Sequence, residues 1–169
     1  MMRIKLAYGR EGLWIDIPDQ ARSTIIEPLF VEGLEDEAGS LVAALRKPIG
    51  TPPLAAMIKR EDNVAIVFSD ITRPMPNDRV LPVLLNEIAR AGVPDQQIVL
   101  INGLASHRKQ TAAELEQMLG REIYQRFRVV QHDAWDEANL VDAAPNRCGR
   151  MVKVNRAYME ANVRILTGF

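Results

Sequence analysis

The sequence has little of several features that mark specialised classes of protein. Cys148 is the only cysteine among 169 residues, so no disulfide can form within the chain and a reducing compartment is expected. Charge of one sign is also lacking, because the formal net charge is −1, which gives no broad positive field for non-specific nucleic-acid binding. No apolar run reaches the roughly 18 residues of a membrane span, and the first five residues lack the apolar core of a signal peptide. We expect a cytoplasmic protein with no nucleic-acid or membrane partner.

The motifs of nucleotide-binding sites and of cysteine-based sites are also missing from the sequence. The 10 glycines form neither a G-x-G-x-x-G motif nor a Walker loop, so an ordinary dinucleotide or triphosphate site is not indicated. Cys148 has no second cysteine with which to bind a metal and no obvious partner base, so we interpret it as inert. What is present is ordinary for a globular protein: 47% hydrophobic and 25% charged residues. The length predicts a single domain of residues 1–169.

Apolar strands alternate with amphipathic helices along most of the chain. Residues 3–7 and 13–17 predict a β-hairpin, and residues 21–37 have no clean period. Further strands are expected at 64–68, 98–101, 128–131, 152–154 and 163–166, and helices at 38–46, 54–59, from Asn77 or Asp78 to Arg90, and from a cap at Thr111 to Gly120. Strand–helix–strand alternation favours parallel pairing. The predicted fold is α/β: a three-layer, Rossmann-like sandwich with a mostly parallel sheet and an N-terminal β-hairpin.

Chemically capable side chains follow two of these strands directly. Ser69-Asp70-Ile71-Thr72-Arg73-Pro74 comes after the strand at 64–68, and His107-Arg108 comes after the strand at 98–101. Open α/β sheets bind ligands outside the carboxyl ends of their strands. The two clusters are therefore expected at one edge of the sheet. His132-Asp133 also follows a strand, but nothing in its local sequence assigns it a role.

These residue types suit acid/base chemistry on an anion. Asp70 can hold one nitrogen of the His107 imidazole and leave the other to transfer a proton. Arg73, in a loop stiffened by prolines, can present its planar guanidinium to a carboxylate or phosphate, with the hydroxyl of Thr72 beside it. Simpler interpretations stay open: Asp70 and Arg73 as a helix cap or surface ion pair, and His107 as a solvated loop side chain.

At these two loops the sequence resembles the N-terminal domain of the lactate racemase family, which consists of nickel-dependent 2-hydroxyacid racemases and epimerases. The matching residues are Ser69 to Pro74, His107-Arg108, Thr111 and Glu114-Leu115, and the order of elements matches from about Lys47 to Phe169. The family often has Gly-Thr where this chain has Ala105-Ser106, and commonly a proline at Lys109.

The resemblance implies a fold, a reaction and a division of roles. Family members hold a nickel-pincer nucleotide that takes a hydride from the hydroxyl-bearing carbon and returns it to either face of a 2-keto acid, while two histidines alternate as base and acid. Carried over, His107 is one of those catalytic histidines and Asp70 the carboxylate beside it. Arg73, with Thr72 and Arg108, contacts substrate or cofactor. No metal ligand is assigned in this chain.

The family's second histidine, its cofactor-anchoring lysine and its nickel ligand come after a segment that resembles residues 163–169. We therefore expect this chain to be inactive alone, not to bind the cofactor alone, and to need a C-terminal domain for a small 2-hydroxyacid substrate; a homo-oligomer is possible. Two alternatives stay open: a non-catalytic module that binds a hydroxyacid or nucleotide through Arg73 and Thr72, and a fragment without function of its own.

Overall fold

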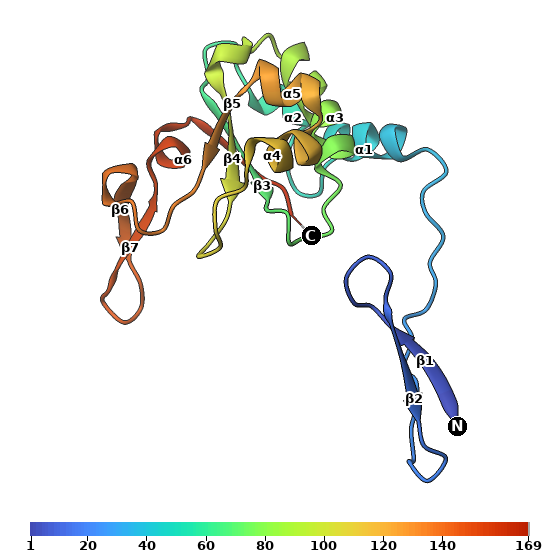
Figure 1. Cartoon of the computed structure of the whole chain (residues 1–169). Coiled ribbons are helices and arrows are strands. Elements are labelled where there is room, and N and C mark those ends of the chain that lie inside the picture. Colours follow the sequence, from blue (N-terminus) through green and yellow to red (C-terminus); the bar gives the residue numbers. More distant parts are fainter. Residues whose placement is uncertain (169) are drawn as a thin grey trace. The chain divides into compact units, whose positions relative to one another are not determined.

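A computed structural model describes residues 1–168. It divides into two compact units, Met1–Gly33 and Leu34–Phe169, whose relative placement is not determined (Figure 1). Each unit is therefore described by itself, and a single domain of residues 1–169 stays a prediction. No helix among residues 1–168 is both long enough and apolar enough to cross a membrane.

The first unit is a two-stranded antiparallel hairpin followed by irregular chain. Strands β1 (Met2–Leu6) and β2 (Leu13–Ile17) pair with Met2 opposite Ile17 and Leu6 opposite Leu13. The hairpin confirms the prediction, although β1 begins and ends one residue earlier than expected. Side chains alternate between faces, so the register gathers six apolar residues on one face of the ribbon. None of the residues of this unit is buried.

The second unit is built on a four-stranded parallel sheet. Its strands are β3 (Val64–Ser69), β4 (Ile98–Gly103), β5 (Arg128–Gln131) and β8 (Val163–Leu166), in the spatial order β5-β4-β3-β8. All three pairings are parallel, which confirms the predicted parallel sheet. Because β3 is covered on both faces, most of its side chains are buried, and its sequence is almost continuously apolar.

Five helices pack on one face of this sheet (Figure 1): α1 (Glu37–Arg46), α2 (Leu54–Met57), α3 (Asn77–Arg90), α4 (Ala112–Leu119) and α5 (Arg121–Arg126). Their apolar stripes meet the same-facing side chains of β3 and β4, with Ile66, Phe68 and Leu100 fully buried at the centre. Leu115 and Leu119 of α4 belong to this core, as the helical spacing predicts.

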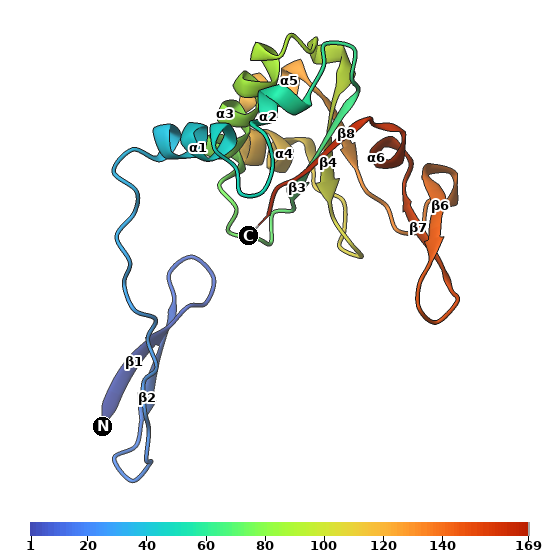
Figure 2. The same ribbon diagram turned by 180° about the vertical axis from the view of Figure 1, so that it is seen from behind.

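The opposite face of the sheet carries a thinner layer. Of the helices in residues 1–168, only α6 (Arg156–Glu160) packs there, in a small cluster with Ala65, Ile101 and Ala161. In Figure 2, as in Figure 1, α6 lies on the side of the sheet away from α1–α5, next to a hairpin of β6 (Leu140–Pro145) and β7 (Met151–Asn155). The three layers are thus present and unequal.

Several elements differ from the sequence prediction. The expected helix at 54–59 ends at Met57, because Ile58 is extended and buried in the core. No side chain caps α3 at Asn77 or Asp78: its N-cap is Pro76, and the amide of Asn77 instead donates to the carbonyl of Ser69. Helices α5 and α6 and strand β6 were not predicted, because these elements of five or six residues carry too little periodicity.

The path of the chain fixes where a site can form. From β3 the chain proceeds outward to β4 and β5 with α3, α4 and α5 on one face, then returns past β6, β7 and α6 to β8 beside β3. The strand order therefore reverses between β3 and β8, and doubly wound sheets bind ligands outside the carboxyl ends of the strands at such a point. The Ser69–Pro74 loop leaves β3 at this edge.

Candidate functional site at the carboxyl edge of the sheet

The structure brings Asp70 and His107 together, as predicted from their places after neighbouring strands. Ser69 at the end of β3 lies opposite Gly103 at the end of β4, so the two loops leave the sheet side by side. His107 Nδ1 lies 2.6 Å from Asp70 Oδ2, across a sequence separation of 37 residues. The Asp70 side chain is only 2% exposed, whereas that of His107 is 43% exposed. A buried carboxylate thus holds an accessible imidazole.

Thr72 completes the support of this carboxylate. Its hydroxyl donates to Asp70 Oδ1 at 2.8 Å, so each carboxylate oxygen has its own donor. The backbone N–H of Arg73 donates to the carbonyl of Asp70 at 3.1 Å and closes the turn that presents Thr72. In this structure Thr72 therefore contacts Asp70; its predicted contact with substrate or cofactor stays a prediction.

The electrostatics favour an ionised Asp70. Burial of the carboxyl acts to raise the pKa of Asp70, but hydrogen bonds from His107 and Thr72 outweigh it and bring that pKa below its ordinary value. An ionised Oδ2 can only accept, so Nδ1 of His107 carries the proton of this contact. In the neutral ring Nε2 is then the free acceptor, which is the arrangement of an oriented general base.

Arg73 lies on the other side of Asp70. It is exposed and lines a hollow of about 200 Å³ together with Asp70, Asn77 and residues of α4. Within residues 1–168 its guanidinium forms no ion pair, so it is available to an anion. A guanidinium recognises a carboxylate or phosphate in a two-pronged geometry.

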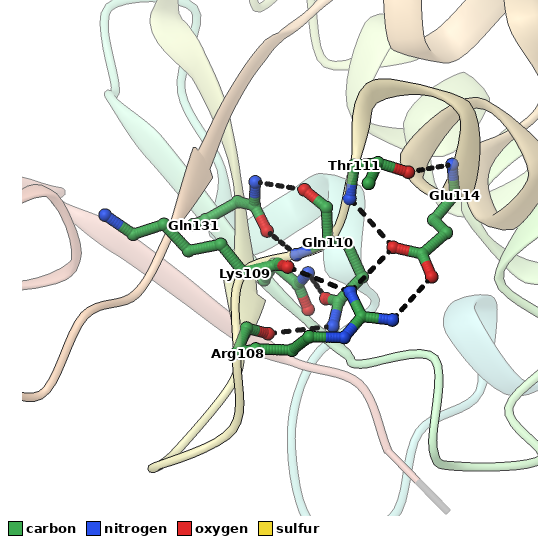
Figure 3. Close-up of polar contacts among 7 residues, drawn as sticks. Arg108, Lys109, Gln110, Thr111, Glu114 and Gln131 are labelled. Atoms are coloured by element: carbon green, nitrogen blue, oxygen red, sulfur yellow. Dashed lines mark hydrogen bonds and ion pairs between the residues drawn. The ribbon is translucent and has the colours of Figure 1, made fainter.

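Arg108 is engaged differently from its neighbour His107. Its guanidinium donates to both carboxylate oxygens of Glu114, at 2.9 and 2.7 Å (Figure 3). Glu114 also accepts from the backbone N–H of Thr111, whose hydroxyl in turn accepts from the Glu114 N–H. This is the predicted capping box of α4, with Arg108 added to it. The predicted contact of Arg108 with substrate or cofactor stays a prediction.

His107 opens onto a second hollow, of about 500 Å³. His132, Lys109, Asp133 and Trp135 line it as well, which places the otherwise unassigned His132 in the same hollow as His107. Lys109 Nζ pairs with Asp133 at 2.9 Å, and this pairing lowers the pKa of Asp133. The Asp70–His107 contact therefore links the hollow beside Arg73 to the hollow beside His132.

Sequence reasoning missed a set of amide side chains that hold the His107 loop. Gln110 is 5% exposed and Asn102 is fully buried. The side-chain amide of Asn102 donates to the side-chain oxygen of Gln110, and the side-chain amide of Gln110 donates to the carbonyl of Arg108. Gln131 at the end of β5 exchanges two hydrogen bonds with the backbone of Gln110 (Figure 3). The one available signal was Asn102 itself, a polar residue at the end of an otherwise apolar strand.

Metal donors do not gather at this site. Among the residues that the structure describes, no three His, Cys, Asp or Glu side chains are placed so that they could hold a metal ion. The described residues therefore do not fit a resident metal by themselves. Cys148 is exposed, and no role is assigned to it.

The second unit is a Rossmann-like α/β unit with an aspartate–histidine pair at the carboxyl edge of its sheet, where open α/β sheets bind their ligands. A family model described as the lactate racemase N-terminal domain matches residues 8–169. The chain belongs to this family.

Two curated relatives are lactate racemases. That of Thermoanaerobacterium thermosaccharolyticum is 28% identical over 179 aligned positions, and that of Lactiplantibacillus plantarum is 27% identical over 171. Each alignment covers 100% of this chain but only 40% of the relative. The chain thus spans less than half the length of the curated relatives that it matches.

Solved structures agree with the fold. The lactate racemase apoprotein of T. thermosaccharolyticum matches 98% of this chain and 38% of its own, with a TM-score of 0.77 and 25% identity. A Thermotoga maritima protein matches 81% of this chain and 34% of its own, with a TM-score of 0.60 and 18% identity, and this match concerns the fold alone. The predicted α/β class and the resemblance to the racemase family are both confirmed.

Proposed function

We propose that this chain supplies one acid/base wall of the active site of a 2-hydroxyacid racemase or epimerase. The observation that carries the proposal is the 2.6 Å contact between buried Asp70 and accessible His107, in a member of the lactate racemase N-terminal domain family. Both curated relatives are named lactate racemases, which makes a small 2-hydroxyacid the substrate class we favour.

His107 is the residue that moves the proton. Oxidation of a 2-hydroxyacid to its 2-keto acid removes a proton from the hydroxyl and a hydride from C2, and racemisation returns both with the hydride on the opposite face. Nε2 of His107 accepts the hydroxyl proton of one enantiomer and, in the reverse reaction, donates it; the family resemblance implies that a second histidine does the same for the other enantiomer. Asp70 keeps Nδ1 protonated and stabilises the imidazolium that forms in between, with Thr72 holding its second oxygen.

Arg73 is the residue we assign to the substrate carboxylate or another anionic group at the site. Its guanidinium is free within the described residues and shares a hollow with Asp70. Thr72 contacts Asp70 and Arg108 contacts Glu114, so both also support the site, and their contact with substrate or cofactor stays part of the proposal.

The hydride must go to a group that this chain does not provide. The nickel-pincer nucleotide implied by the family resemblance accepts such a hydride when bound, but residues 1–168 offer it no metal-donor set. We assign its anchoring to the part of the relatives that this chain does not span, a C-terminal domain. In this proposal the chain contributes two functions: His107 transfers the proton, and Arg73 binds the anionic group of the substrate.

The test is racemisation of L-lactate and longer 2-hydroxyacids by the complete gene product, supplied with nickel and cofactor. Removing the general base in His107→Ala should lower turnover by about 10²- to 10⁴-fold. His132→Ala is the matched control, because His132 lines the same hollow and does not take part in the hydrogen bonds of the Asp70 side chain in the described residues. Retained racemisation in His107→Ala contradicts the assigned role. Hydroxyacid binding without any racemisation in the unaltered protein supports the non-catalytic binding module instead.

A further inference from the structure

The loop that carries His107 is fixed at two buried points. Leu104, directly after β4, is 1% exposed, and Gln110, directly before the cap of α4, is 5% exposed. The five residues between them are all exposed, and His107 lies in the middle. A hydrogen bond from the His107 N–H to the carbonyl of Leu104, at 2.9 Å, closes a tight turn next to the first anchor. The second anchor sets where the rest of the loop returns.

The second anchor is made of amides, and we call it the amide clamp: Asn102, Gln110 and Gln131. The side chain of Gln131 accepts from the Gln110 backbone N–H at 2.7 Å and donates to the Gln110 carbonyl at 2.9 Å, as an adjacent strand would (Figure 3). The Gln110 side chain accepts from the amide of Asn102 and donates to the carbonyl of Arg108 at 3.2 Å. Every bond of the clamp ends on the His107 loop or on the strands beside it.

The amide clamp includes residues of two neighbouring strands, so it fixes the position of the loop relative to the sheet. Asn102 is on β4 and Gln131 on β5, and the two residues are register partners in the parallel sheet. The carbonyl of Asn102 also accepts from the N–H of His132 at 3.1 Å. Buried amide bonds are costly to leave unmade, so the loop has one favoured position relative to the sheet. Asp70 leaves the same sheet edge from β3, and its contact with His107 tolerates little displacement.

We propose that Gln110 and Gln131 are positioning residues that hold the His107 imidazole against Asp70 through the amide clamp. The assignment deepens the proposed function, on which its catalytic meaning rests. The clamp acts on the general base without touching the substrate. It also makes the end of β5 a part of the site.

The variant that tests the clamp is Gln131→Met, which fills the same space and removes both bonds to Gln110. The readout is the titration of the Asp70 carboxyl carbon by ¹³C NMR in the 169-residue chain. When His107 moves away, Asp70 loses the hydrogen bond that lowers its pKa, while burial continues to raise that pKa. The titration midpoint of Asp70 should therefore move to a higher pH.

Gln97→Met is the matched control. Gln97 precedes β4 at the opposite edge of the sheet, and its side chain donates to the carbonyls of Asp62 and Arg60 at 2.9 and 3.3 Å. It therefore loses comparable bonds far from the loop. A rise of the Asp70 midpoint in Gln131→Met alone supports the clamp. An unchanged midpoint in Gln131→Met, or an equal rise in both variants, overturns it, because the amides then act only on general stability.

A measurement on the unaltered chain covers the case in which Gln131→Met does not fold. Hydrogen exchange of the Gln110 N–H should be at least tenfold slower than that of Lys109, its exposed neighbour; equal exchange overturns the clamp. In the complete gene product, Gln131→Met should lower kcat more than it changes KM. If the Asp70 midpoint moves while racemisation does not, the clamp stands and the proposed catalytic role of the pair fails.

Discussion

At the scale of single residues, Ala105 carries the clearest cost in the His107 loop. Its φ of 50° makes it the one non-glycine residue with left-handed backbone among those that the structure describes. This conformation costs a residue with a Cβ roughly 1–2 kcal/mol. Glycine adopts the turn without that cost while losing roughly 0.5–1 kcal/mol more in chain entropy. The loop geometry is thus kept in this chain against local preference.

Ala105→Gly should therefore raise the free energy of unfolding by about 0.5–1 kcal/mol, the difference between these two costs. Urea denaturation followed by circular dichroism measures it. Ala43→Gly, in the exposed middle of α1, is the matched control and should lower the free energy of unfolding by roughly 0.5–1 kcal/mol. The same loss in both variants would show that Ala105 is not under strain.

At the scale of elements, the start of α4 depends on an ionised Glu114. Hydrogen bonds from Arg108, together with those from Thr111, hold the pKa of Glu114 at about 2, against an ordinary value of 4.5. A carboxyl whose pKa is lower in the folded state stabilises the fold above its unfolded pKa and loses that contribution as the pH falls through the folded value. The stability of the cap should therefore decline between pH 4.5 and about 2.

Glu114→Gln should flatten this decline, because the amide cannot be protonated and no longer pairs with Arg108. The measurement is the free energy of unfolding from pH 5 down to about 2, compared with the unaltered chain. Glu116→Gln is the control on the same helix: that carboxylate caps no backbone N–H and lies 3.7 Å from Arg121. An unchanged slope in Glu114→Gln would mean that the cap does not carry the pH dependence.

The same scale shows what the sequence could predict. Strands β3 and β4 were found because both faces of the sheet are covered there and their apolar runs are plain. Strands β5 and β8, at the two edges of the sheet, have no buried residue and were predicted from short apolar runs alone. The Asp70–His107 contact followed from the rule that parallel strands end at one edge. The amide clamp could not be predicted, since glutamines carry no motif and the pairing of Gln110 with Gln131 depends on distances set by the folded loops. Short α5, α6 and β6 are fixed by tertiary contacts rather than by periodicity.

At the scale of the whole molecule, no residue of the N-terminal unit belongs to the apolar core. Both core clusters consist entirely of residues beyond Gly33. The first unit has no buried residue, although the register of β1 and β2 gathers apolar side chains on one face. A two-stranded hairpin alone is marginally stable in water. The stability of residues 34–169 should therefore be independent of the first 33 residues.

A variant that starts at residue 34 should keep the melting temperature of the full chain to within about 3 °C, because a loss of 1 kcal/mol shifts the melting of a unit of this size by roughly that amount. Thermal denaturation followed by circular dichroism measures this directly. Hydrogen exchange supplies the second half of the argument: in the full chain the paired amides of β1 and β2 should exchange well before those of β3 and β4, which lie inside the core. A shortened chain that melts many degrees lower, or slow exchange in β1 and β2, would mean that the first unit stabilises the sheet and its site.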